Sequence, residues 1–147
     1  MNWTTLLKFR KQVEDMAREA VVLTEWEKSQ ERAKVNLLYR EMDMIVGDLA
    51  TLWHEGTESL LTRERYRWMD VLRGQLEEQE RKLQALDEKL VGLRDKLKKS
   101  FQARRVVELV IEKKEREVFE TLARQEQQLH DEIPAHAYSM RRHEEIA

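Results

Sequence analysis

Residues 76–97 read LEEQERKLQALDEKLVGLRDKL. Leucines and one glutamine recur in this stretch at alternating steps of three and four residues: Leu76, Gln79, Leu83, Leu86, Leu90, Leu93 and Leu97. A repeat that averages 3.5 residues is typical of a helix that packs along a narrow seam, the line of side chains facing one partner helix. The stretch therefore predicts a coiled-coil helix.

The first half of the chain carries a matching register, which runs through Val35, Leu38, Met42, Ile45, Leu49 and Leu52. His54-Glu55-Gly56-Thr57 separates the two registers, and glycine suits the left-handed conformation that follows many helix ends. Together they predict an all-α fold, an antiparallel two-helix coiled-coil hairpin with a longer, overhanging C-terminal helix. We expect a single elongated domain over 1–147, with helix one at about 3–55, the turn at about 56–61, helix two at about 62–132 and a flexible tail at 134–147 after Pro134.

Upstream of Val35, a further run of apolar residues steps by three and four: Leu6, Phe9, Val13, Met16, Ala20 and Leu23. We expect this run to be the seam of the first part of helix one. Its spacing to Val35 is not a whole number of heptads, so the register should slip between Leu23 and Val35.

The second helix is predicted to be longer than the first. Pairing the helices outward from the turn places Trp3 near Lys113, so residues 114–133 should project about 30 Å as unpaired helix. This segment contains Val118, Phe119, Leu122 and Leu129, and a lone charged helix of this length is marginal in water. We therefore expect it to dock into a partner.

The composition limits the possible functions. Charged residues make up 38% of the chain, and there are four glycines, one proline and no cysteine. Without cysteine, disulfides, thiolate zinc sites and cysteine nucleophiles are excluded, and the chain suits a reducing cytosol. The amino terminus has no apolar stretch of signal-peptide length and no window resembles a spanning helix, which predicts a soluble protein.

Charge is close to balanced overall but uneven locally. The formal net charge of -2 favours neither nucleic acid nor anionic lipid as a partner. Between Arg94 and Arg105, however, basic residues outnumber the single Asp95: Arg94, Lys96, Lys98, Lys99, Arg104 and Arg105. This block is either a solvated helix surface or a docking patch for an acidic partner surface.

No catalytic or metal site is predicted. His54-Glu55 could begin the zinc motif HExxH, but position 58 is glutamate, so the second histidine is missing. His130, His136 and His143 have no defined ligand spacing. No phosphate-binding glycine loop or nucleophile elbow occurs. We expect a protein that is not an enzyme and needs no cofactor.

Tryptophan is large for a two-helix seam. We expect Trp53 to pack at the turn end of the hairpin and Trp68 to face the stretch around Asp48. Both structural packing and contact with a partner remain open for these residues and for Trp26.

The two-helix plan and two stretches of the second helix resemble the flagellar export protein FliJ family. These stretches are RRVVELVIEKK at 104–114 and RQEQQLHDE at 124–132. The resemblance implies a cytoplasmic stalk, similar to the gamma stalk of rotary ATP synthases and peripherally associated with the inner membrane. Its partners would be the hexameric export ATPase, which it binds at the pore and whose assembly or activity it promotes, the cytoplasmic domain of the export gate, and export chaperones.

The resemblance also implies binding residues. The ATPase-binding set would be Phe9, Arg10, Lys11, Val13, Arg116, Phe119, Arg124, Gln127, Asp131 and Glu132. The export-gate set would be Tyr39, Trp68, Leu72, Gln75 and Gln79. The basic block and the tail beyond Pro134 have no counterpart among these roles.

Two alternatives remain. A stalk protein of virulence type III secretion would have the same physical plan. A generic coiled-coil scaffold could satisfy the registers by parallel homodimerisation, whereas the stalk is expected to be a monomer when free. A prefoldin-like subunit would need strands at the turn, and the sequence offers none.

Overall fold

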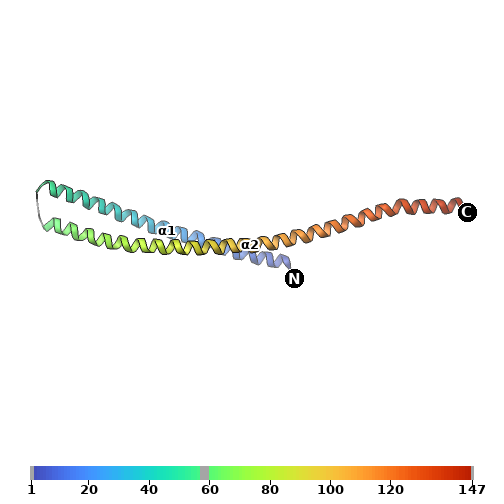
Figure 1. The fold of residues 1–147 in the computed structure, drawn as a ribbon, viewed down its shortest axis with the longest axis horizontal. Helices are drawn as coiled ribbons and strands as arrows, with labels where there is room; N and C mark the ends of the chain where they lie inside the picture. Colours follow the sequence, from blue (N-terminus) through green and yellow to red (C-terminus); the bar gives the residue numbers. More distant parts are fainter. Residues whose placement is uncertain (1, 57–59, 147) are drawn as a thin grey trace. The chain divides into compact units, whose positions relative to one another are not determined.

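The computed structural model describes residues 2–56 and 60–146. Helix α1 covers Trp3–His54 and helix α2 covers Leu60–Ile146, and they run side by side in opposite directions (Figure 1). The described residues contain no strand. The predicted all-α hairpin with a longer second helix is confirmed, with 52 residues in α1 and 87 in α2.

Local signals fix both ends of α1. The Asn2 side-chain Oδ1 accepts a hydrogen bond from the Thr5 N–H at 3.3 Å, which caps the amino terminus of the helix. At the other end Gly56 has φ +70°, the left-handed conformation predicted for it, and its N–H donates to the Trp53 carbonyl at 3.2 Å. Residues 57–59 of the predicted turn lie outside the described residues.

Helix α2 continues through Pro134 to Ile146, whereas the sequence predicted its end at about 132. Proline fits the helical φ but leaves the carbonyl four residues earlier without its usual N–H donor. Residues 130–134 are all exposed, so water can satisfy that carbonyl. The flexibility of 134–147 and the single elongated domain stay predictions.

By its contacts, the chain divides into two units. The hairpin unit is residues 12–101, and the terminal unit is residues 1–11 with 102–147. In the hairpin unit, the core cluster is Ile45, Leu49, Met69 and Leu72, with Leu38 and Met42 packed against it. The seven seam residues predicted between 76 and 97 are all buried or half-buried. The apolar registers near the turn therefore form the core, as predicted.

The register of α1 differs from the prediction upstream of Val35. Ten of its buried and half-buried residues keep one unbroken alternation of three and four steps: Trp3, Leu7, Arg10, Glu14, Ala17, Val21, Thr24, Lys28, Glu31 and Val35. Phe9, Met16 and Leu23 are 55%, 69% and 58% exposed. Leu6, Val13 and Ala20 of the expected seam are half-buried at its edge. The expected seam is therefore wrong for Phe9, Met16 and Leu23, and so is the expected slip.

The physical reason is that a coiled-coil helix presents one face to its partner. The register set by residues 35–52 continues upstream, and polar side chains are accommodated on it. Thr24 is 2% exposed, and its hydroxyl donates to the Ala20 carbonyl at 2.8 Å. The Glu14 carboxylate, also buried, accepts a hydrogen bond from Arg18 at 3.1 Å. The displaced apolar residues are left on a second face.

Candidate partner-binding surfaces

The terminal unit shows where the pairing of the two helices stops. The Lys114 Nζ lies 4.9 Å from the centroid of the Trp3 ring, a cation–π contact. The prediction of Trp3 beside Lys113 is thus correct to within one residue. From 112 to 134 every side chain of α2 is exposed. The segment 115–134, about 30 Å of helix at 1.5 Å per residue, has no facing helix among the described residues.

Apolar side chains lie along this unpaired segment. Val118 is 60% exposed, Phe119 72%, Leu122 55%, Leu129 60% and Ile133 65%. Phe119, Leu122, Leu129 and Ile133 fall on one alternation of three and four residues if Glu126 fills the remaining position. An apolar stripe of this spacing is suited to packing against a partner.

The predicted ATPase-binding residues of α2 all lie in the unpaired segment and are exposed: Arg116, Phe119, Arg124, Gln127, Asp131 and Glu132. In α1, Phe9 and Lys11 are exposed, and Arg10 and Val13 are half-buried. The Arg10 guanidinium carbon lies 5.9 Å from the Phe9 ring centroid. Nearly all of this set is accessible to a partner.

The predicted export-gate residues do not form a single surface. Leu72 is fully buried in the core. The Tyr39 hydroxyl donates to Glu80 at 3.3 Å, on one side of the hairpin. Gln75 and Gln79 line a hollow together with Lys34 and Leu37. Trp68 is seven residues before Gln75 on α2, so it lies in the same row.

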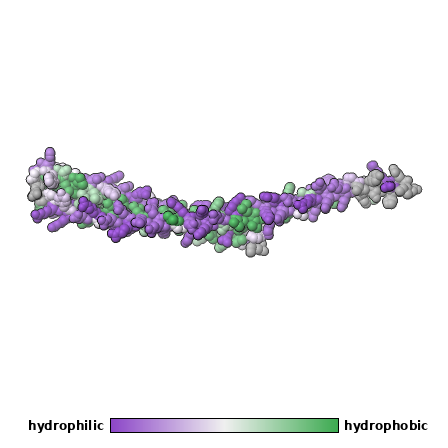
Figure 2. Space-filling view, in the orientation of Figure 1, coloured by the Kyte–Doolittle hydropathy of each residue, from purple (hydrophilic) through white to green (hydrophobic). Residues whose placement is uncertain are grey.

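Aromatic and aliphatic side chains are exposed near the turn. Trp53 is 75% exposed, Leu60 75%, Tyr66 50% and Trp68 46%. Figure 2 shows some hydrophobic residues at this end of the hairpin, among predominantly hydrophilic ones. Trp53 therefore does not close the hairpin end as a buried cap, and the partner-contact interpretation of these residues stays a prediction.

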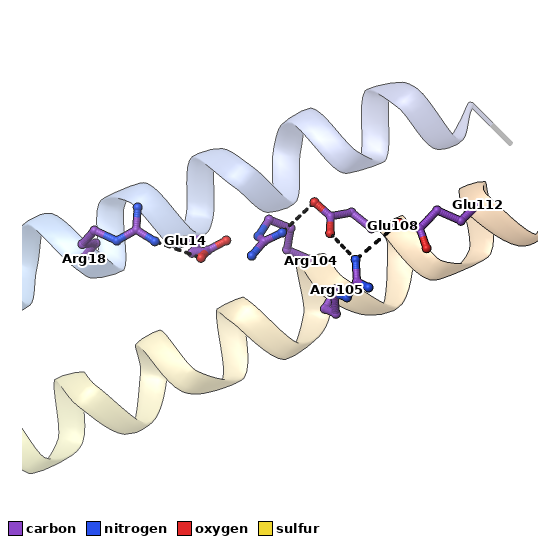
Figure 3. A network of polar contacts seen from close by, with 6 residues as sticks. All are labelled: Glu14, Arg18, Arg104, Arg105, Glu108 and Glu112. Carbon is purple, nitrogen blue, oxygen red and sulfur yellow. Dashed lines mark hydrogen bonds and ion pairs between the residues drawn. The ribbon is translucent and has the colours of Figure 1, made fainter.

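Much of the basic block is engaged in ion pairs. Arg94 pairs with Glu25 at 3.1 Å, and Lys99 pairs with Asp95 at 3.0 Å. Arg104 and Arg105 reach the same Glu108 carboxylate at 2.6 and 2.9 Å, as Figure 3 shows. This leaves Lys96 and Lys98 without a described ion partner.

The Glu108 cluster shifts the titration of its members. The Arg105 hydrogen bond, followed by that of Arg104, lowers the pKa of Glu108 below its ordinary value of 4.5. The hydrogen bond to Glu108 and the charge of Glu112 raise the pKa of Arg105. The cluster is a helix-stabilising network of residues three, four and seven apart.

The described residues contain no group of three histidine, aspartate or glutamate side chains placed to hold a metal ion. In the same part of the chain, no helix is long and apolar enough to cross a membrane.

Comparison with known proteins gives one match. The model of the family described as flagellar FliJ protein matches residues 3–143. Neither the curated proteins nor the solved structures gave a match. Because the match covers nearly the whole chain, including both helices and the unpaired segment, the chain belongs to the flagellar FliJ protein family, a family of the flagellar export apparatus.

Proposed function

We propose that this protein is a non-enzymatic stalk and coupling component of the flagellar type III export apparatus. The unpaired end of α2 binds the hexameric export ATPase at its pore and promotes its assembly or activity. Exposed residues of the hairpin contact the cytoplasmic domain of the export gate. The protein then lies on the cytoplasmic side of the inner membrane, held there through its partners, and is a monomer when free.

One observation carries the ATPase contact. Residues 112–134 form a helical segment with every side chain exposed, and an apolar stripe lies along it. Burying such a stripe stabilises a complex by roughly 25 cal/mol per Å² of apolar surface. A helix with no facing helix is suited to binding at the pore of a ring, because side chains on all of its faces can contact the surrounding subunits.

The gate contact is best supported on the row that contains Trp68 and Gln75. Both side chains are exposed, and aromatic residues are enriched at binding hot spots. Leu72 belongs to this proposal only as a core residue that positions α2, because it is 0% exposed. Tyr39 lies with Glu80 on the other side and would contribute only to a partner that reaches around the hairpin.

The test is the turnover rate of the same organism's export ATPase as the protein is titrated in. The full chain should stimulate ATP hydrolysis, and a chain ending at Glu117 should not. A matched pair of point variants separates binding from folding. Leu122→Glu with Leu129→Glu should abolish stimulation without changing hairpin stability, whereas Val91→Glu, on a 69% exposed residue of the hairpin unit, should have no effect.

Stimulation by the truncated chain would contradict the proposal, as would full stimulation by the Leu122 and Leu129 double variant. The gate contact is tested separately by Trp68→Ala, which should weaken binding to the gate domain and leave ATPase stimulation unchanged. Equal loss of both would remove Trp68 from the gate contact.

A further inference from the structure

The two long sides of the hairpin unit differ in the polar contacts that join α1 to α2. On one side, polar side chains connect α1 to α2. Arg94 pairs with Glu25, Lys28 with Asp87, and the Tyr39 hydroxyl with Glu80. We call this the bridged side. Its two ion pairs and one hydrogen bond join residues 25–39 of α1 to residues 80–94 of α2. Nearer the turn, Arg65 pairs with Asp48 at 3.6 Å, in the heptad row of Lys34.

The opposite side, which we call the open side, has two hollows between the helices. One, of about 290 Å³, is lined by Lys34, Leu37, Leu38, Gln75, Glu78 and Gln79. The other, of about 400 Å³, is lined by Glu27, Gln30, Glu31, Lys82, Ala85 and Leu86. Gln79 Oε1 and Glu31 Oε2, one in each lining, are buried and accept no hydrogen bond. The hairpin thus leaves polar acceptors on this side unsatisfied.

Residues seven apart keep the same position on a coiled-coil helix, so the rows that line the hollows can be followed further. On α1, Leu37 and Gln30 are followed by Leu23 and Met16, and Lys34 and Glu27 by Ala20. On α2, Gln75 and Lys82 are followed by Lys89 and Lys96, and Glu78 and Ala85 by Gly92 and Lys99. The displaced apolar face of α1 therefore lies on the open side.

Beyond the second hollow, the two walls of the open side differ in chemistry. The α1 wall is apolar, with Met16 69% and Leu23 58% exposed. The α2 wall is cationic, since Lys89 and Lys96 are exposed and their side-chain amines form no ion pair with a described residue. Between these lysines, a Cβ added at Gly92 would meet nothing within 4 Å. This stretch of the open side thus combines an apolar wall on α1 with a cationic wall on α2.

We propose that the open side between residues 16–23 of α1 and 89–99 of α2 docks an acidic amphipathic helix of a partner protein. Apolar residues of that helix, at steps of three and four, pack on Met16, Ala20 and Leu23. Carboxylates along one edge pair with Lys89 and Lys96. The complex is a three-helix coiled coil, because α1 presents two seams at heptad spacing, one for α2 and one for the partner.

Charge selects a partner helix over a second copy of this chain. The row residues of the proposed groove include four cationic or neutral positions on α2, Lys89, Gly92, Lys96 and Lys99, and no carboxylate. A two-fold symmetric pairing sets a surface against itself, so Lys89 and Lys96 would gain no anionic partner from these rows. The surface also lies outside the ATPase-binding and gate-binding sets, so the inference does not depend on the proposed function.

The experiment uses the full chain and two fluorescein-labelled helical peptides of four heptads. Both carry leucine at the seam positions. One has glutamate and the other lysine at the flanking positions. Fluorescence anisotropy should show binding of the glutamate peptide, weakening as salt rises, and at least tenfold weaker binding of the lysine peptide.

Variants locate the site. Lys89→Glu with Lys96→Glu should reduce affinity for the glutamate peptide at least tenfold, and Met16→Gln with Leu23→Gln should reduce it similarly. The matched control is Arg81→Glu with Lys98→Glu, which makes the same charge change at exposed positions outside the rows and should retain at least half the affinity. Circular dichroism establishes that all variants keep their helicity.

Three results would overturn the proposal. They are equal binding of the two peptides, equal loss in the groove and control variants, and unchanged affinity after Met16→Gln with Leu23→Gln. Sedimentation velocity of the free chain adds a fourth. A concentration-dependent dimer that the Met16 and Leu23 substitutions abolish would assign the open side to self-association.

Discussion

Residues 76–97 and 112–134 of α2 have similar patterns and opposite environments. In both stretches, apolar residues recur at steps of three and four. The first set is buried or half-buried, whereas every side chain of the second is exposed. The difference is that α1 faces the whole of the first stretch, whereas beyond Lys114 the second stretch has no facing helix among the described residues. A heptad pattern therefore indicates that a helix can pack against another helix, but not that the same chain supplies that helix. For the second stretch, we expect a partner protein to supply it.

The largest expected effect is a difference in how alanine substitutions in the paired and unpaired parts of α2 change the free energy of unfolding. Leu72→Ala, at a 0% exposed core position, should lower the free energy of unfolding by about 2–5 kcal/mol. Leu129→Ala, at a 60% exposed position, should change it by less than about 0.5 kcal/mol. Urea unfolding followed by circular dichroism at 222 nm measures both. Comparable losses would mean that the unpaired segment is buried in the free protein.

The second prediction concerns a substitution that makes a polar position of the α1 seam apolar. Glu31→Leu removes a carboxylate with an unsatisfied buried oxygen and places an apolar side chain on the seam beside Val35. It should raise the free energy of unfolding by about 1 kcal/mol. The control is Glu27→Leu, one position outside the seam, where a smaller gain is expected. A loss of stability for Glu31→Leu would show that the carboxylate supports the hairpin.

The third prediction compares two glycines. Gly92→Ala should stabilise the hairpin by about 1 kcal/mol, because alanine favours the helix and its Cβ meets open space. Gly56→Ala should destabilise it by about 1 kcal/mol, because φ is +70° there. Thermal unfolding of the two variants should shift in opposite directions, and shifts of the same sign would contradict the assigned backbone conformations.

The smallest effect is expected from Glu108. Its native pKa is lowered by Arg105 and Arg104, so its contribution to stability is present above about pH 5 and is lost as pH falls through the lowered pKa. At pH 7 the Glu108→Gln variant should unfold at a slightly lower temperature than the parent chain. This difference in unfolding temperature should disappear at acidic pH, where Glu108 is protonated in the parent chain. A difference in unfolding temperature that persists at pH 2 would indicate that Glu108 stabilises the helix by something other than its ionised contacts with Arg104 and Arg105.

Sequence reasoning located the elements that depend on local or repeated signals. The αL conformation at Gly56, the leucine seam from 76 to 97 and the pairing of Trp3 close to Lys113 all follow from residue type and helix rise. The end of α2 was predicted wrongly. Pro134 is a strong signal for a helix end in the sequence, but an exposed helix can continue through a proline. Site reasoning grouped Tyr39 with Gln79, although they lie on different sides of the hairpin. Two residues at a similar height along the hairpin can face different sides, because the heptad position decides which side a residue faces.

The sequence by itself determined that this protein is a two-helix hairpin whose second helix extends beyond the first, because heptad spacing and chain length need no knowledge of contacts. Only the tertiary structure decided which of two overlapping registers in α1 faces α2. Residues 3–31 contain both an apolar run through Phe9, Met16 and Leu23 and a mixed run through Glu14, Thr24 and Glu31. The mixed run is buried because it continues the face already fixed by residues 35–52 against α2, and the apolar run is left exposed on the open side.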